Sequence, residues 1–298
     1  MMDTSTFNAF MAKQVKLLRK AGKHRTAETY QTTLNRLEGF MEGRGLSFRE
    51  ITPALMESFE SYLLERNCRN TTSFYMRILR AVYNRGVDRG LTRQRHPFRH
   101  VYTGVDRTRK RAVTLSVIRR LKALDLSGHP DWARARDLFM FSFYTRGMSF
   151  IDMAFLRRSD LRGGVLRYFR RKTGQELCIR WEPDMQAIVD RYPERHGEFL
   201  LPILSGPEKD YRRQYKQAIT KTNRDLANIS HLLGLSIPIT TYVARHSWAS
   251  IAYSKSVPVA LISEGMGHDS ERTTRIYLAS VSNSGVDRAN RKILHLLE

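Results

Sequence analysis

The sequence predicts a mainly α-helical protein with one small antiparallel sheet. Along most of the 298 residues, apolar side chains recur at three- and four-residue steps, which is the pattern of a helix with one buried face. Only residues 165–181 contain short β-prone runs on both sides of a turn. Because the chain exceeds the commonest single-domain length, we expect two domains, each with its own core.

The first part of the chain is expected to be a small helical bundle. Its apolar stripes predict helices at residues 7–18, 26–41, 55–64 and 74–82. Gly86 and Gly90 are expected to end the last of these helices. No alternating strand pattern occurs before residue 160, so the sheet belongs to the second part.

The second part combines helices with a β-hairpin. Helical patterns cover residues 115–124, 132–144, 211–233, 242–253 and 286–297. The β-prone runs are residues 165–169 and 177–181, and the sequence RRKTGQ joins them. Gly174 in this join eases a tight turn, so we expect the two runs to pair as a hairpin.

The charge balance predicts a polyanionic partner. The chain has 51 Lys and Arg against 29 Asp and Glu, which gives a net charge of +22. There are 21 basic and 10 acidic residues up to Lys110, and 30 and 19 after it, so each part carries +11. Nucleic acid is the commonest polyanion that binds such proteins. On charge alone, a ribosomal-type or membrane-surface protein is the alternative.

A basic segment connects the two predicted domains, and Asp106 is its only acidic residue between Arg89 and Arg111. Its candidate DNA-binding residues are Arg93, Arg95, Arg99, Arg107, Arg109, Lys110 and Arg111. We interpret the segment as one that crosses a phosphate backbone, with a solvated linker as the alternative. We expect the first domain at residues 1–105, the linker at 106–111 and the second domain at 112–298.

The sequence predicts a soluble protein with no membrane partner. It contains no run of about 18 apolar residues, and its N-terminus lacks the order of a signal peptide. Cys68 and Cys178 form no metal-ligand spacing, so we expect packing residues of a reducing compartment and no metal site. We therefore expect a cytoplasmic, nucleoid-associated protein of bacterial type.

The segment TTYVARHSWAS contains the first group of candidate site residues. Tyr242, Arg245 and His246 lie at helical spacings of three and four, so their side chains share one face. Thr240 or Thr241 is expected to cap the start of this helix. A buried arginine paired with a carboxylate is the alternative interpretation of this face.

The segment EGMGHDSERTTRIYLAS contains the second group. Two glycines precede His268, Asp269 and Ser270 can cap a short helix, and Tyr277 lies nine residues beyond the histidine. An unbroken helix turns about 100° per residue, which would place His268 and Tyr277 on opposite faces. If the two meet, a break must redirect the chain. An ordinary core tyrosine is the alternative for Tyr277.

The two segments occur together and in a fixed order along the chain. Through these motifs, residues 111–298 resemble the catalytic domain of the tyrosine recombinases, the phage integrase family. The matching residues are Arg245-His246, Met266-Gly267-His268, Tyr277, Lys172 within RKTG, and the upstream stretch RGMSFIDMAFLRRSDL. Residues 26–100 resemble the family's helical, SAM-like core-binding domain. The resemblance covers about nine tenths of the chain and implies a core-binding domain followed by a catalytic domain.

Two departures from the family pattern concern the site. The family usually has a histidine three residues before its second arginine, where this chain has Tyr242, a poor acid–base group with a reference pKa of about 10. The family's first arginine usually stands three residues before an acidic residue, and counted from Asp152 that place belongs to Ser149. Arg146 lies one further helical turn upstream, where a long guanidinium can reach the same phosphate. We favour Arg146, with Ser149 as the alternative.

The resemblance implies that the protein transfers DNA strands without a metal ion or a nucleotide cofactor. Tyr277 would attack phosphorus and form a 3′-phosphotyrosine, which frees a 5′-hydroxyl. His246 would steady the arrangement or assist proton transfer. Because the new ester retains the energy of the broken bond, a 5′-hydroxyl from another strand can reverse the attack without ATP.

The resemblance also assigns roles to the surrounding residues. Arg245 and Arg146 would hold the non-bridging oxygens with paired N–H donors, which a lysine could not do equally well. His268 and Tyr242 would add hydrogen bonds to the phosphate. Lys172, on the hairpin, would protonate the leaving oxygen.

Strand exchange implies particular partners. These are double-stranded DNA with inverted-repeat-like core sites and a homotetramer on two sites, with a monomer or weak oligomer when free. In the family the C-terminal helix docks into a neighbour, and residues 286–298 are suited to that, although packing on their own domain is the alternative.

The sequence leaves two other functions open. It also does not distinguish integration, excision and inversion. A type IB topoisomerase would cleave and reseal one strand without exchange. A DNA-binding accessory protein would have an impaired active site, for which Ser149 in the arginine position is the best support.

Overall fold

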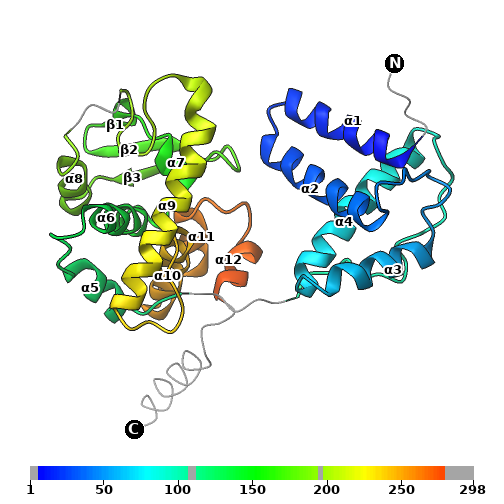
Figure 1. Ribbon diagram of the computed structural model, residues 1–298. Coiled ribbons are helices and arrows are strands. Elements are labelled where there is room, and N and C mark those ends of the chain that lie inside the picture. The colour runs from blue at the N-terminus through cyan, green and yellow to red at the C-terminus, as the bar shows by residue number, and fades with distance from the viewer. Residues whose placement is uncertain (1–5, 107–111, 194–196, 279–298) are drawn as a thin grey trace, which may run out of the picture. The chain divides into compact units, whose positions relative to one another are not determined.

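The structure, a computed structural model, describes residues 6–106, 112–193 and 197–278. These residues are mainly helical, with a three-stranded antiparallel sheet (Figure 1). The prediction of a mainly α protein with a small antiparallel sheet is therefore confirmed. The chain divides into two compact units, Met1–Thr108 and Arg109–Glu298, and each is described by itself.

The described part of the first unit is a helical bundle around one apolar core. Its helices are α1 (Phe7–Lys20), α2 (His24–Phe40), α3 (Pro53–Leu64) and α4 (Arg69–Asp88). The side chains of Thr6 and Thr52 cap α1 and α3 by accepting backbone N–H groups. α1 packs along α2 (Figure 1), and large side chains such as Phe10, Phe59 and Tyr83 fill the core. The four predicted helices of this part are confirmed.

The prediction that Gly86 ends the fourth helix is wrong. α4 continues to Asp88, and Gly90, with φ of 69°, follows its end. Gly86 is buried inside α4 because the ring of Phe48 packs directly on it. A Cβ at position 86 would lie 2.2 Å from the Cε1 atom of that ring. The glycine therefore serves close packing between a helix and a loop rather than helix termination.

The described part of the second unit packs helices against one face of a small sheet. They are α5 (Leu115–Ala123), α6 (Pro130–Tyr144), α7 (Phe150–Ala154), α8 (Pro183–Asp190), α9 (Tyr211–Leu232), α10 (Thr241–Ser254), α11 (Val259–Gly265) and α12 (Glu271–Leu278), with 3-10 turns η1 (Arg158–Asp160) and η2 (Glu208–Asp210). α6 packs against both α9 and α10 (Figure 1). The helices predicted at residues 115–124, 132–144, 211–233 and 242–253 are confirmed. The one predicted at residues 286–297 lies outside the described residues.

The sheet has the strand order β1 (Leu161–Arg162), β2 (Val165–Phe169) and β3 (Glu176–Arg180). β2 and β3 form the predicted hairpin, with Arg167 opposite Cys178. Leu166 and Ile179 face the core, so alternate residues of each strand face solvent. β1 was not predicted, because two residues are too few to show a strand pattern.

The two cysteines are exposed, which corrects the expectation that they are packing residues. Cys178 lies on the outward face of β3, where alternation of the strand places it. Cys68 precedes α4 at its N-cap position.

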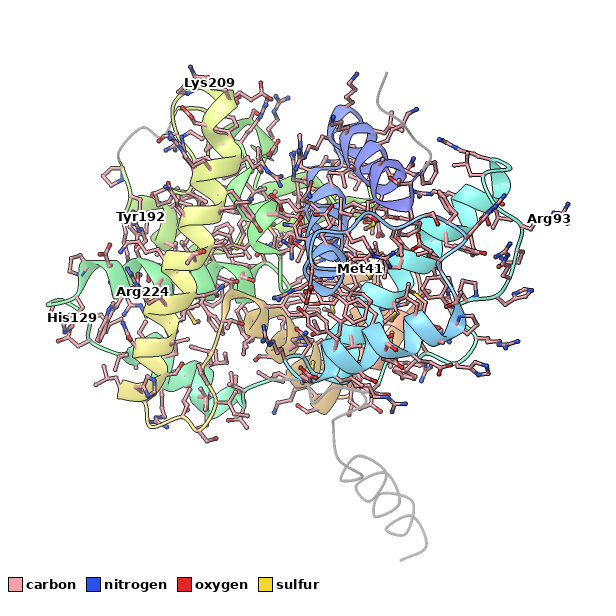
Figure 2. All side chains as sticks on the ribbon, turned by 45° about the vertical axis from the view of Figure 1, so that its right-hand side comes forward. Met41, Arg93, His129, Tyr192, Lys209 and Arg224 are labelled. Carbon is pink, nitrogen blue, oxygen red and sulfur yellow. The ribbon has the colours of Figure 1, made fainter. Side chains whose placement is uncertain are left out.

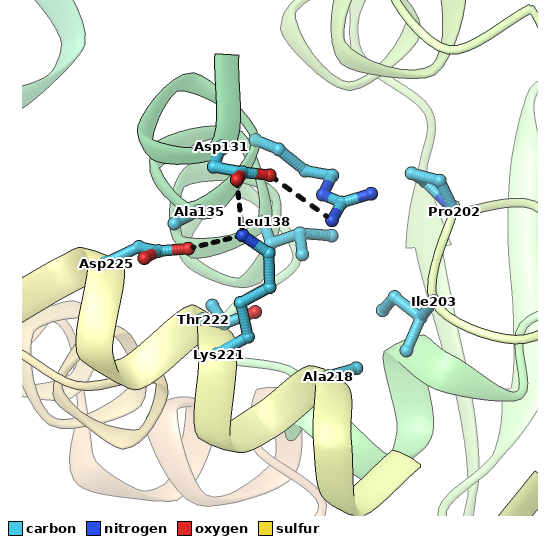
Figure 3. A pocket seen from close by; sticks show the side chains of 10 residues that line it. Asp131, Ala135, Leu138, Pro202, Ile203, Ala218, Lys221, Thr222 and Asp225 are labelled. Atoms are coloured by element: carbon cyan, nitrogen blue, oxygen red, sulfur yellow. Dashed lines mark hydrogen bonds and ion pairs between the residues drawn. The ribbon is translucent and has the colours of Figure 1, made fainter. Parts of the chain in front are cut away.

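An ion cluster connects α6 with α9 (Figure 3). The ammonium group of Lys221 lies between the carboxylates of Asp131 and Asp225, at 3.4 Å from Oδ2 of Asp225. Asp225 is buried, and the hydrogen bond from Lys221 holds the pKa of Asp131 below its usual range. A cavity of about 30 Å³, large enough for a water molecule, lies beside the cluster. The cluster thus ties α6 to α9.

Within residues 6–106, 112–193 and 197–278, every helix is either too short or too polar to span a bilayer.

Packing around Gly86 predicts a loss of stability on adding one methyl group. Gly86→Ala should destabilise the first unit by about 1–3 kcal/mol, because the ring of Phe48 must move. Gly39→Ala is the matched control, since that helical glycine has only the Tyr62 hydroxyl at 3.9 Å from a Cβ. It should be neutral or add up to about 1 kcal/mol. Denaturant unfolding followed by far-ultraviolet circular dichroism measures both, and equal stability of the two variants would contradict the prediction.

Candidate active site

Arg245 in α10 is the centre of the candidate site. Its side chain is buried, with only 3% of the residue exposed. Nη1 donates to the carbonyl of Gly147 at 2.7 Å, and Nη2 donates to the carbonyl of Met266 at 2.6 Å. Nη2 also lies 2.9 Å from Nε2 of His268. One guanidinium therefore connects α10 with the turn after α6 and with the turn after α11.

His268 is buried and neutral. Because Nη2 of Arg245 can only donate, Nε2 of His268 accepts, and Nδ1 carries the proton that is donated to Oγ1 of Thr274 at 2.7 Å. Burial lowers the pKa of His268 from 6.5 to about 3, and the positive charges of Arg245, Arg170 and Lys172 lower it as well. These partners require the tautomer in which Nε2 is the acceptor.

α12 contains Tyr277 and is anchored beside His268. Thr274, which accepts from His268, lies three residues before Tyr277 and is fully buried. α12 packs against α10 and α11. His268 precedes the helix, which begins at Glu271, so the geometry of one unbroken helix does not apply to their nine-residue spacing. The side chain of Tyr277 lies outside the described residues, and its meeting with His268 stays a prediction.

The turn after α6 approaches Arg245 closely. Arg146 and Gly147 both have positive φ, 61° and 77°. A Cβ on Gly147 would lie 2.6 Å from Cα of Arg245, so only glycine fits there. Arg146 is half-buried, and its Cδ lies 3.5 Å from the place of a Cβ on Gly265, the last residue of α11. An arginine in the left-handed region is uncommon and often marks a functional site.

Ser149 has a local structural role. Its hydroxyl donates to Oδ2 of Asp152 at 2.6 Å and accepts the Asp152 N–H, which caps α7. Oδ1 of Asp152 accepts the backbone N–H of Arg171 at 2.9 Å, which ties α7 to the hairpin. We expected Arg146 and Ser149 to share a helical face, and this expectation is wrong. Arg146 and Gly147 have positive φ values, so Arg146 lies in a turn before α7 begins. The choice of Arg146 over Ser149 stays a prediction.

Lys172 is exposed in the turn between β2 and β3. Gly174, with φ of 73°, eases this turn as predicted. The charge of Lys172 acts on His268, so its amine lies within electrostatic reach of the site. Arg170, which was not predicted as a site residue, is buried and donates from Nη1 to the carbonyl of Gly267. Nothing in the run RRK distinguishes a buried arginine from an exposed one.

Tyr242 and His246 contact each other on α10. Their ring centroids are 4.7 Å apart and the rings are nearly perpendicular. His246 is buried, whereas Tyr242 is 50% exposed. Thr240 is the N-cap residue, but its side chain makes no capping hydrogen bond among the described residues. Asn223 from α9 accepts the N–H of Thr241 at 2.9 Å instead, which corrects the expected threonine cap.

The basic segment after α4 packs on the first unit up to residue 106. The hydroxyl of Tyr83 donates to the carbonyl of Arg93 at 3.0 Å, and Phe98 is buried in the core. Arg93, Arg95 and Arg99 are exposed, and Arg93 projects outward from the segment (Figure 2). The remaining candidate DNA-binding residues, Arg107, Arg109, Lys110 and Arg111, lie outside the described residues.

A groove of about 760 Å³ lies beside the hairpin of the second unit. It is lined in part by four arginines: Arg157, Arg162, Arg167 and Arg171. The guanidinium of Arg171 lies 3.9 Å above the ring centroid of Phe155. These arginines were not predicted as a group, because they are spread over 15 positions of the chain.

Both units match known family models. Residues 6–101 match the phage integrase SAM-like domain, and residues 117–283 match the phage integrase family. The search of curated proteins returned no match.

Solved structures with a similar fold share little sequence identity with this chain. A lambda integrase dimer bound to a core site is 16% identical, with a TM-score of 0.67, over 92% of this chain and 77% of that one. The Tn1549 transposon integrase in complex with a circular intermediate DNA is 14% identical, with a TM-score of 0.68, over 97% and 100%. The XerH site-specific recombinase bound to its difH substrate is 17% identical, with a TM-score of 0.61, over 89% and 81%. The shared fold is what these comparisons establish.

The lowered pKa of His268 predicts a loss of stability in acid. An unfolded histidine has a pKa of about 6.5 and folded His268 one of about 3, so the unfolded state binds more protons between these pH values. The contribution of neutral His268 is complete above about pH 6.5 and is lost as pH falls toward 3, at up to about 1.4 kcal/mol per pH unit.

Denaturant unfolding at pH 7 and pH 5 measures this contribution, with His268→Gln as the variant that cannot titrate. The wild-type protein should lose about 2 kcal/mol more than the variant between the two values. Equal losses in both proteins would contradict the neutral, buried state of His268.

Proposed function

This chain belongs to the phage integrase family, and on that premise we propose that it is a site-specific recombinase that cleaves and rejoins DNA through a 3′-phosphotyrosine. The observation that carries the proposal is the buried cluster in which Arg245 contacts His268, and His268 in turn contacts the helix that contains Tyr277. A basic group, an acid–base group and a nucleophile beside one phosphate are the components that this reaction requires.

In the proposed cleavage step, the oxygen of Tyr277 attacks phosphorus and the bond to the 5′-oxygen breaks. Arg245 and Arg146 hold the non-bridging oxygens and stabilise the charge that develops on them. Lys172 gives a proton to the leaving 5′-oxygen. In the reverse step a 5′-hydroxyl attacks the phosphotyrosine, and the same groups act in the opposite direction.

The hydroxyl proton of Tyr277 needs an acceptor. Neutral His268 offers Nε2 once the Nη2 group of Arg245 turns to the phosphate, whose negative charge would raise the pKa of His268 again. Thr274 holds the opposite nitrogen in the required tautomer. A hydrogen bond from Nε2 to the phosphate, which the resemblance implies, would need the other tautomer. His246, whose ring packs against Tyr242, supports the arrangement from α10.

We propose double-stranded DNA with inverted-repeat-like core sites as the substrate and a homotetramer on two sites as the working assembly. A similar structure is a lambda integrase tetramer bound to a Holliday junction, 17% identical with a TM-score of 0.66 over 93% of this chain and 78% of that one. The net charge of +22 and the exposed arginines of both units favour DNA. The same chemistry serves integration, excision or inversion according to where the sites lie, and it would act at a bacterial nucleoid without a metal ion.

Replacing the proposed nucleophile should abolish covalent DNA attachment. DNA recovered with the protein is sequenced, and a nicked duplex of that sequence is incubated with the protein in the presence of a chelator. The wild-type protein should form a complex that withstands denaturant, whereas Tyr277→Phe should form none and still bind the duplex.

Tyr253→Phe, an exposed tyrosine at the end of α10, is the matched control and should retain the complex. A normal yield from Tyr277→Phe would remove Tyr277 from the role of nucleophile. Loss of the complex on chelation alone would contradict the metal-free reaction.

The same assay separates Arg146 from Ser149 as the phosphate ligand. Arg146→Ala should lower the cleavage rate by about a hundredfold or more, because a guanidinium on the developing charge is lost. Ser149→Ala should lower stability by about 1 kcal/mol through the lost cap of α7 and leave cleavage by the folded protein nearly unchanged. Full activity of Arg146→Ala would defeat this assignment, whereas no cleavage by the wild-type protein would favour the impaired accessory protein as the alternative.

A further inference from the structure

We propose that Arg170 is a positioning residue that fastens the β2–β3 hairpin, with Lys172, to the turn that holds His268. The inference rests on the proposed function, because both residues belong to the site described above. It adds a residue that acts through others rather than by touching DNA.

The backbone of Arg170 closes the base of the hairpin turn. Its N–H donates to the carbonyl of Gln175 at 2.8 Å, and its carbonyl accepts the N–H of Gly174 at 2.7 Å. Lys172 lies two residues further along this turn. The position of the Arg170 backbone therefore determines the position of the Lys172 backbone.

The side chain of Arg170 leaves the hairpin and contacts the turn after α11. It is 6% exposed, and Nη1 donates to the carbonyl of Gly267. Its Cδ lies 3.2 Å from the place of a Cβ on Gly267, and Cδ1 of Leu177 lies 2.9 Å from the same place. Gly267 has φ of 63° and no room for a side chain, because the hairpin packs directly on this turn.

Two guanidinium groups thus hold successive carbonyls of one turn. Arg245 reaches the carbonyl of Met266 from α10, and Arg170 reaches that of Gly267 from the hairpin. Hydrogen bonds from a charged donor are stronger than neutral ones, and burial excludes competing water. His268 follows directly, so the two arginines together define the position of its backbone.

The charges around His268 are consistent with this placement. The groups that act on it are Arg245 on α10 and Arg170 and Lys172 on the hairpin, all of them positive. Without the contact from Arg170, the hairpin would lose its side-chain tether to the turn, and the lysine amine would sample more positions. Displacement of a catalytic group by about 1 Å can lower a rate by about a hundredfold.

Hydrogen exchange in the full chain without DNA tests the tether itself. Arg170→Met should raise amide exchange in residues 171–175 and in residues 267–269 together, by about tenfold, while α6 and α9 are unchanged. Arg167→Met is the matched control, because Arg167 lies on β2 three residues before Arg170, is exposed and pairs at the surface with Glu176. It should leave exchange at residues 267–269 unchanged.

Unchanged exchange at residues 267–269 in folded Arg170→Met would overturn the proposal. If that variant does not fold, Gly267→Ala replaces it. The added methyl group would collide with Cδ1 of Leu177 and so push the hairpin away from the turn. Gly267→Ala should then raise exchange in residues 171–175, and unchanged exchange there would overturn the proposal equally.

Cleavage of the nicked duplex tests the consequence for Lys172. Arg170→Met should lower the cleavage rate by about a hundredfold and change the DNA affinity less than about twofold, with partial recovery in Arg170→Lys. A duplex with sulfur in place of the 5′ leaving oxygen needs no proton donor, since a thiolate is a good leaving group. With that duplex, Arg170→Met and Lys172→Met should both recover most of their loss, whereas Arg245→Met should not.

These results separate the two proposals. Absence of any covalent complex with the wild-type protein would count against the recombinase function, and the exchange experiment would still decide on the tether. A loss in Arg170→Met that persists fully with the sulfur duplex, while Lys172→Met recovers, would overturn the link between Arg170 and Lys172.

Discussion

The burial of one positive charge governs the arrangement of the candidate site. Arg245 is almost fully buried, and a guanidinium that leaves water is strongly destabilised unless acceptors receive its N–H groups. The acceptors here are the carbonyls of Gly147 and Met266 and the ring of His268. They belong to two turns that are far apart in the sequence, so the fold that buries the arginine must also bring these turns together. Stability of the second unit and geometry of the site are therefore coupled.

The close packing of these turns also requires glycine at two positions. A Cβ on Gly147 would collide with the backbone of Arg245, and a Cβ on Gly267 would collide with Leu177 of the hairpin. Both glycines have positive φ, which lets their carbonyls face the guanidinium donors. The close approach also concentrates positive charge around a buried histidine. His268 consequently stays neutral in the absence of DNA, because it is buried among positively charged groups.

Local patterns were sufficient to predict most helices and the hairpin, because apolar periodicity and a turn glycine act over a few residues. They failed where a distant group decides the outcome. Gly86 looked like a helix end, yet Phe48 from another segment packs on it inside α4. Arg170 looked like its neighbours in a basic run, yet its side chain is buried against Gly267. Contacts of this kind leave no local signal in a single sequence.

By itself, the sequence determined the fold class, the charge and the family, because periodicity, composition and a motif such as Arg245-His246 can be recognised along the chain. Only the tertiary structure decided which nitrogen of His268 accepts a hydrogen bond, that Ser149 caps a helix, and that Arg146 lies in a left-handed turn. The physical reason is that burial, tautomer and hydrogen-bond partner depend on groups from remote segments, which the chain brings together only when it folds.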